Sequence, residues 1–214
     1  MADYAEEKSL AEARDRALGL DTAATEAEIG ARLAREAPDR ERRTWNHLSP
    51  QVFQTPYAEL ARIVREADPE RRARVWADLG AAYGRLGIVL SEIRPDARFI
   101  GIELVPERVR EGRRVYRALG LDPETLIAAD LRGHALPAAD LYFIYDFGPR
   151  AEIEGVLAAL RPHALLRPIT VVGRGRGVRD AIERRHPWLA GVIPPVHGPH
   201  SSIYRSAVRE SESR

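Results

Sequence analysis

The sequence of 214 residues contains no cysteine, a single lysine and no long apolar run. Without cysteine the chain has no disulfide, no thiolate metal ligand and no thiol nucleophile. No apolar run approaches the roughly 20 residues that cross a bilayer. The polar, acidic residues 1–8 lack the apolar core of a signal peptide. These absences favour a cytoplasmic globular protein without a membrane partner.

The chain also has no large excess of positive or negative charge. The formal net charge is +1, from 33 basic and 32 acidic residues, and every basic residue apart from Lys8 is arginine. Arginines alternate with glutamates and aspartates along the expected helices, which is typical of a solvated surface. Because a near-neutral chain exerts no general attraction on phosphates, the composition argues against a nucleic-acid partner.

Strands alternating with helices are predicted from residue 55 onward. A parallel sheet with helices on both faces follows from this order, so the fold class is α/β. One of the helices is expected to stop near Pro162. The apolar runs that predict five strands and a closing antiparallel pair are residues 75–79, 98–103, 125–129, 140–146 and 168–173, then 191–193 with 202–207.

The first fifty residues have a different character. Residues 3–18 and 24–37 are rich in Ala, Glu, Arg and Leu and predict two helices with thin apolar stripes. Such helices need a larger body to dock on. We therefore expect a helical N-terminal extension at residues 1–50 and a main domain at residues 51–210.

The segment VWADLGAAYGRLG at residues 75–87 is the most informative motif. An apolar strand ends in an acid, and glycines lead into a helix whose apolar residues recur at helical spacing. A glycine turn of this kind lets backbone N–H groups and a helix N-terminus come close to a ligand. It predicts a site for a nucleotide-type cofactor.

Carboxylates follow four of the five main strands. They are Asp78, Glu103, Asp130 and Asp146, each at or next to the carboxyl end of its strand. Ligands of open α/β sheets bind at this edge. We therefore expect the four acids to gather around one site.

The spacing of the motif narrows the choice of cofactor. Gly80, Gly84 and Gly87 do not fit the G-x-G-x-x-G dinucleotide pattern, and a Walker loop needs a lysine. The segment resembles the D-x-G-x-G-x-G motif of class I S-adenosylmethionine-dependent methyltransferases. Asp78, Gly80 and Gly84 match that motif, and Ala82 stands where the middle glycine is expected. The resemblance covers roughly residues 55–208.

The resemblance implies a Rossmann-like, seven-stranded, mostly parallel sheet that binds S-adenosylmethionine. It implies that Asp78 and the glycine turn, Ala82 included, hold the methionine end. Glu103 would bind the ribose hydroxyls and Asp130 the adenine amino group. The segment after the fourth strand would face the methyl acceptor, with Asp146 as a candidate general base or, equally, a cap of the following turn.

A further likeness concerns the methyl acceptor. Residues 54–57 (QTPY) resemble the T-P element of archaeal and mitochondrial protein-lysine methyltransferases, which folds over the cofactor. This adds Thr55 and Tyr57 to the expected cofactor site and favours a protein side-chain nitrogen as acceptor. The segment YDFGP at residues 145–149 has neither an asparagine nor N-P-P-Y, so it leaves the acceptor open.

Other functions stay open at this point. The acceptor could be an RNA or a small molecule, or Ala82 and YDFGP could mark a cofactor-binding module without catalysis. A nicotinamide-dependent oxidoreductase is disfavoured by the acid that ends the first strand. His197 and His200 have no third ligand at a suitable spacing, so no metal site is predicted.

Overall fold

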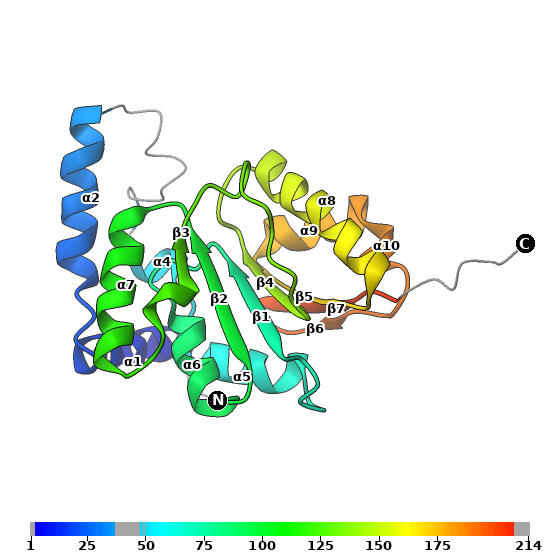
Figure 1. Cartoon of the computed structure of the whole chain (residues 1–214), viewed down its shortest axis with the longest axis horizontal. Helices are drawn as coiled ribbons and strands as arrows, with labels where there is room; N and C mark the ends of the chain where they lie inside the picture. Colours follow the sequence, from blue (N-terminus) through cyan, green and yellow to red (C-terminus); the bar gives the residue numbers. More distant parts are fainter. Residues whose placement is uncertain (1–2, 37–47, 49, 208–214) are drawn as a thin grey trace, which may run out of the picture.

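The structure, a computed structural model, describes residues 3–36, 48 and 50–207. They form one seven-stranded sheet with helices on both faces (Figure 1). The strand order is β3-β2-β1-β4-β5-β7-β6; β1 to β5 are parallel, and β7 runs antiparallel to β5 and β6. The strands are β1 (Val75–Leu79), β2 (Arg98–Glu103), β3 (Leu126–Ala128), β4 (Leu141–Tyr145), β5 (Thr170–Arg174), β6 (Val196–His197) and β7 (Ser201–Arg205).

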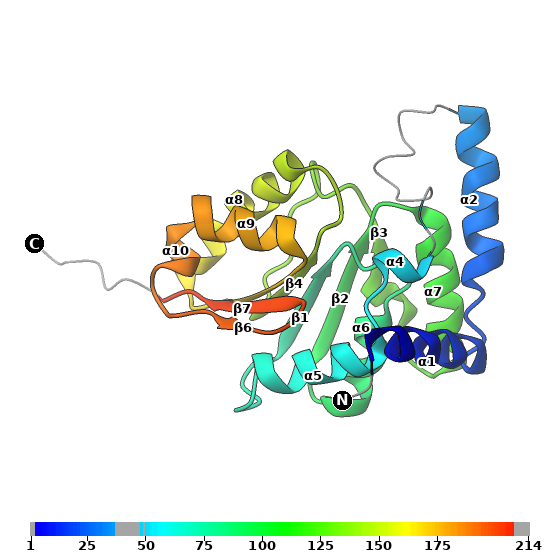
Figure 2. The ribbon, with the colours of Figure 1, turned by 180° about the vertical axis from the view of Figure 1, so that it is seen from behind.

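Two sets of helices cover the sheet, as the two opposite views show (Figures 1 and 2). On one face lie α5 (Tyr57–Ala67), α6 (Arg85–Ile93) and α7 (Pro106–Ala118), with the short 3₁₀ helix η2 (Pro123–Thr125) before β3. On the other lie α8 (Arg150–Leu166), α9 (Arg176–Arg185) and α10 (Pro187–Ala190). The extension adds α1 (Tyr4–Ala17) against α5 and α2 (Thr22–Glu36) against α7, and α4 (Pro50–Phe53) precedes α5.

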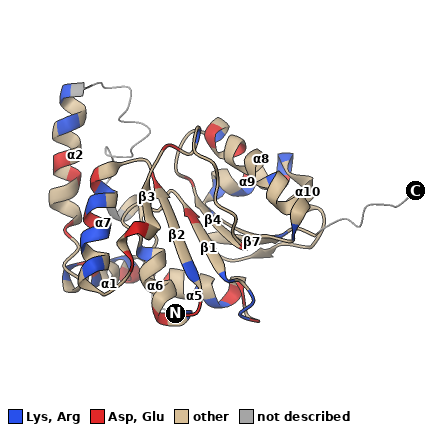
Figure 3. Cartoon of the chain, in the orientation of Figure 1, with Lys and Arg blue, Asp and Glu red and all other residues tan. Residues whose placement is uncertain are grey.

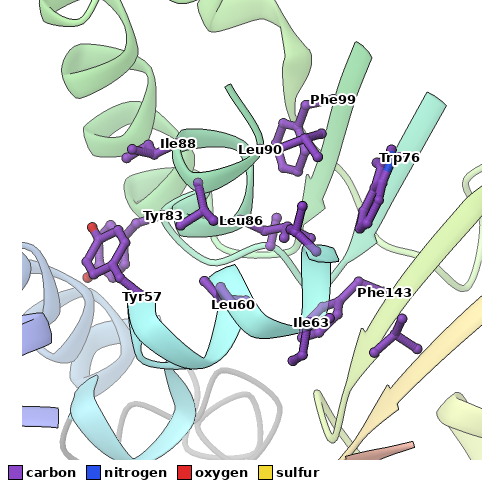
Figure 4. Packing of buried hydrophobic residues seen from close by; sticks show 14 of the residues in the cluster. Tyr57, Leu60, Ile63, Trp76, Tyr83, Leu86, Ile88, Leu90, Phe99 and Phe143 are labelled. Carbon is purple, nitrogen blue, oxygen red and sulfur yellow. The ribbon is translucent and has the colours of Figure 1, made fainter. Parts of the chain in front are cut away.

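Side-chain alternation along the strands divides the core into two layers. Trp76 and Phe143 pack beneath α5 and α6, as Figure 4 shows, whereas Leu79 and Ile144 pack beneath α8. Since Asp78 is two residues from Trp76, its side chain points toward the α5 and α6 layer. A carboxyl group is thereby placed at the edge of an apolar core.

A buried ion pair ties the extension to the glycine turn. Asp15 of α1 accepts hydrogen bonds from the guanidinium of Arg85, the first residue of α6, and from the Tyr57 hydroxyl at 2.8 Å. Arg85 also donates to the carbonyl oxygen of Thr55 at 3.2 Å. Both charged side chains are at most 5% exposed. The extension is therefore part of the same packed body as the turn.

The predicted α/β architecture and the bounds of β1 and β2 are confirmed. Two expectations were wrong. Helix α8 continues through Pro162 to Leu166, since the exposed proline faces water and the buried Leu160 and Ala164 hold the helix on the sheet. Residues 191–193 form a turn after α10, and the partner of β7 is Val196–His197, beyond two prolines that have no N–H for a ladder.

The Asp15→Ala variant should lose about 3–5 kcal/mol of unfolding free energy, because Arg85 would keep its charge in a buried position without a carboxylate. Urea unfolding followed by circular dichroism measures this loss. The matched control is Glu92→Ala, which removes the exposed Arg14–Glu92 pair and should cost at most about 1 kcal/mol. Equal losses in the two variants would contradict the structural role of the Asp15–Arg85 pair.

Candidate functional site

The turn between β1 and α6 is held against β2 by backbone hydrogen bonds. The N–H groups of Gly80 and Ala81 both donate to the carbonyl oxygen of Ile102 at 2.9 Å. Gly80, Ala82 and Gly84 have positive φ angles of 99°, 47° and 81°. The sequence supplies glycine at two of these positions, whereas Ala82 adopts a left-handed conformation that costs an L-residue about 1–2 kcal/mol.

Asp78 ends β1 in a buried position, 5% exposed. Within the described residues its carboxyl group makes no hydrogen bond or ion pair. Burial raises the pKa of Asp78 to about 8, and the neighbouring Glu103 carboxylate contributes in the same direction. A cationic ligand group would relieve this cost, since an opposite charge favours the ionised carboxylate.

Glu103 ends β2 on the other side of the turn. Its two oxygens accept hydrogen bonds from the N–H groups of Ala82 at 2.8 Å and Val105 at 2.9 Å. The Arg108 guanidinium is 3.8 Å away and is held in a bidentate pair by Glu26 of α2, at 2.7 and 2.9 Å. Because a carboxylate oxygen can accept more than one hydrogen bond, Glu103 is oriented and still able to bind ligand hydroxyls.

Two small cavities flank this turn. One, of about 60 Å³, is lined by Glu103 and Asp130 together with Asp146 and Phe147. The other, of about 30 Å³, is lined by Asp78 and Thr55 together with Gln54. They share Gly80, Ala82, Phe53 and Tyr145 as lining residues.

Gln54 is a candidate that the sequence prediction did not single out. The residue is 4% exposed, and among the described residues neither its amide nitrogen nor its amide oxygen has a hydrogen-bond partner. An unsatisfied buried amide costs about 1–3 kcal/mol, so such groups are rare unless a ligand or water completes them. It lines the same cavity as Asp78, and the pair could bind a ligand group that carries both a cation and a hydrogen-bonding oxygen.

Asp146 caps helix α9. Its two carboxylate oxygens accept hydrogen bonds from the N–H groups of Gly177 at 3.0 Å and Val178 at 2.7 Å. Burial raises the pKa of Asp146, and the two N–H groups oppose that effect. This cap joins Asp146 to a helix that begins about 30 residues later, and not to the turn that directly follows it, as the sequence suggested. General-base catalysis stays a prediction.

A third, larger cavity of about 590 Å³ opens beside the first two. It shares Phe53, Tyr145 and Asp146 with the cavity that contains Glu103. Its other walls come from α1, the start of α9 and the turn between β6 and β7. Its volume lies within the roughly 300–1,000 Å³ typical of small-molecule sites.

Seven of the nine predicted site residues line the two small cavities: Asp78, Gly80, Ala82, Glu103, Asp130, Thr55 and Asp146. Gly84 is instead the N-cap residue directly before α6, and its carbonyl oxygen accepts from the Tyr116 hydroxyl at 2.7 Å. Tyr57 is in the core with its hydroxyl on Asp15, so the structure does not place its side chain at these cavities.

Comparisons with known proteins establish the fold. No protein-family model and no curated protein matches the chain. Mitomycin 7-O-methyltransferase MmcR is similar with a TM-score of 0.57 and 16% identity, over 83% of this chain and 60% of its own. The pyocyanin biosynthetic protein PhzM is similar with a TM-score of 0.54 and 16% identity, over 84% of this chain and 61% of its own. This chain thus spans less than two thirds of the length of either protein.

A third match is closer in size. The RNA methyltransferase from Salinibacter ruber, in complex with S-adenosyl-L-homocysteine, has a TM-score of 0.52 and 23% identity, over 74% of this chain and 95% of its own. At these identities the likeness concerns the fold. The chain has the class I S-adenosylmethionine-dependent methyltransferase fold, as its sequence predicts.

In residues 3–36, 48 and 50–207, no helix is long and apolar enough to cross a membrane. In that same part of the chain, no group of three or more His, Cys, Asp or Glu side chains could hold a metal ion.

The Ala82→Gly variant should unfold at higher denaturant, with a gain of about 0.5–1 kcal/mol, because relief of the left-handed strain exceeds the added chain entropy of glycine. The neighbouring Ala81→Gly is the matched control: its φ is not positive and its side chain is buried, so this variant should be destabilised. If both substitutions changed stability in the same direction, the turn would not be strained at Ala82.

Proposed function

We propose that this protein is an S-adenosylmethionine-dependent methyltransferase that acts on a small molecule. The observation that carries the proposal is the pairing of a carboxyl group and an amide, Asp78 and Gln54, both buried and without partners among the described residues, in one cavity of a methyltransferase fold. The methionine end of the cofactor offers an ammonium for Asp78 and a carboxylate for the Gln54 amide nitrogen.

The remaining cofactor contacts follow from the second small cavity. Glu103, already oriented by the Ala82 and Val105 N–H groups, is placed to accept from ribose hydroxyls. Asp130 lines the same cavity and is paired with Arg132 at 2.7 Å; we assign it to the adenine end. When bound, the cofactor supplies an electrophilic methyl group on a sulfonium, so no covalent residue of the protein is required.

Phe147 has to move for a cofactor to bind. A Cβ atom added to Gly80 would lie 2.9 Å from the Phe147 Cβ, so this side chain packs directly on the glycine turn. The two small cavities hold far less than the roughly 300–1,000 Å³ of a small-molecule site. Displacement of Phe147 would join them along the turn.

The 590 Å³ cavity is the place for the methyl acceptor. It shares Tyr145 and Asp146 with the cofactor cavity, so an acceptor bound there lies next to the cofactor site. The protein's contribution is then to hold the acceptor in line and to exclude water. Asp146, fixed by two N–H groups, is the carboxylate nearest to both cavities and the candidate to accept a proton from the acceptor.

The volume of this cavity favours a small molecule as the methyl acceptor. Nothing in the comparisons supports the protein-lysine target suggested by residues 54–57, and the similar proteins include a mitomycin 7-O-methyltransferase and an RNA methyltransferase. Basic and acidic side chains are mixed over α2, α7 and α8 (Figure 3), so these helices present no uniformly basic stripe for RNA. A small molecule fits the cavity volume best.

Calorimetric titration with S-adenosyl-L-homocysteine tests the cofactor assignment. Gln54→Ala and Glu103→Gln should each weaken binding by about 1–3 kcal/mol, the range for a buried hydrogen bond to a charged or unsatisfied group. Glu124→Gln, which changes an exposed carboxylate outside both cavities, is the control and should leave the affinity unchanged. Wild-type affinity in both site variants would remove the assignment.

A further inference from the structure

We infer that the methyl acceptor is a small organic anion, carrying a carboxylate or phosphate, and that Arg176 binds its charged group. The inference rests on the proposed function, because it names the substrate class of the same site. It depends on the charges that line the 590 Å³ cavity, on their partners and on the aromatic rings in the same lining.

The described lining of the cavity is rich in cations. Lys8, Arg174, Arg176 and Arg179 contribute positive side chains, and Asp146 is the one carboxylate among the described lining residues. The whole chain, by contrast, has a formal net charge of only +1. The excess is therefore local, and clefts lined by one sign of charge concentrate ligands of the opposite sign.

Arg174 and Arg179 have carboxylate partners. Arg174 is buried and forms a bidentate pair with Glu59 at 2.9 and 2.8 Å, and it also donates to the Tyr4 hydroxyl at 2.6 Å. Arg179 pairs with Glu183 at 2.9 Å. These partners fix the two guanidinium groups and offset their charge.

Arg176 is different. It is exposed at the first position of α9, lines the cavity and forms no ion pair or hydrogen bond with any other described side chain. The Asp146 carboxylate accepts hydrogen bonds from the N–H groups of Gly177 and Val178, and among the described residues it forms no ion pair with Arg176. A planar guanidinium with free donors suits bidentate binding of a carboxylate or phosphate.

The electrostatic surroundings of Lys8 show the same local excess of positive charge. Burial lowers the pKa of this lysine, and the charges of Arg174 and Arg85 lower it further, ahead of the opposing effect of Glu59. Cations held this close to one another are destabilised by mutual repulsion. A bound anion would reduce that repulsion.

Aromatic rings line part of the cavity. Tyr4 and His200 close one side, with ring centroids 4.4 Å apart, and Phe53 and Tyr145 border the side next to the cofactor cavities. Tyr4 and Lys8 come from α1, so the N-terminal extension builds part of the wall. Aromatic rings beside a guanidinium favour a planar organic body with one charged end.

Three phenols of matched shape and different charge test the inference: 4-hydroxybenzoate, 4-hydroxybenzamide and 4-hydroxybenzylamine. Their dissociation constants are measured by NMR titration into protein saturated with S-adenosyl-L-homocysteine. The benzoate should bind about tenfold more tightly than the amide, because it adds one charge-assisted hydrogen bond, and the amine should bind most weakly.

The variant Arg176→Gln should bring the benzoate and the amide to within about twofold of each other, while leaving the affinity for the amide unchanged. The matched control is Arg184→Gln, an equal change of charge at an exposed residue of the same helix that does not line the cavity. It should preserve the tenfold preference.

The result that overturns the inference is a benzoate that binds no more tightly than the amide, or a preference that Arg176→Gln and Arg184→Gln reduce equally. The prior titration with S-adenosyl-L-homocysteine separates this failure from that of the proposed function. A protein that binds the product cofactor and shows no preference for the anion refutes only the acceptor class, whereas absence of cofactor binding refutes the methyltransferase proposal itself.

Discussion

The turn between β1 and α6 brings two carboxyl groups, those of Asp78 and Glu103, into one buried corner. The N–H groups of Gly80 and Ala81 donate hydrogen bonds to the carbonyl oxygen of Ile102, which fixes the turn on β2. The next N–H group, that of Ala82, donates to the Glu103 carboxylate. Asp78 is left without a partner in the described structure, and its pKa is raised by burial and by Glu103. A cation beside Asp78 would favour its ionised form, and the ammonium of the proposed cofactor would supply that cation.

The N-terminal helices support this corner from outside the sheet. Asp15 of α1 holds Arg85 at the start of α6, Glu26 of α2 holds Arg108 beside Glu103, and Tyr4 accepts from Arg174 beside the 590 Å³ cavity. Each contact joins the extension to an arginine next to one of the three cavities. The extension thus shapes the site, although its charged helices carry only thin apolar stripes.

Local sequence patterns predicted the features that depend on residues close together in the sequence. Apolar runs gave β1 and β2 to the residue, and acids at strand ends placed Asp78 and Glu103 at one edge, because parallel strands share a direction. Long-range partners were not predictable in this way. Nothing near Tyr57 in the sequence indicates Asp15, and nothing near Asp146 indicates the N–H groups of Gly177 and Val178, 31 and 32 positions away.

Gln54 was missed for a related reason. A glutamine ahead of a helix carries no pattern of its own, and its importance rests on burial without a partner, which only the packed structure reveals. Ala82 is the reverse case: the sequence marked it as a departure from the motif, and the structure shows that the alanine still adopts the left-handed conformation of the expected glycine. The departure therefore places an L-residue in a conformation that favours glycine, which adds strain to the turn.

Proton release during cofactor binding tests the role of Asp78 most directly. With a pKa of about 8, this carboxyl group is mostly protonated at pH 7 in the free protein, and an ammonium beside it favours the ionised form. Calorimetric titration with S-adenosyl-L-homocysteine, in two buffers of different ionisation enthalpy, should show release of about one proton at pH 7 and much less at pH 9. Asp78→Asn should abolish the release at pH 7. Tight binding without proton release, or equal release from the Asp78→Asn variant, would contradict the account.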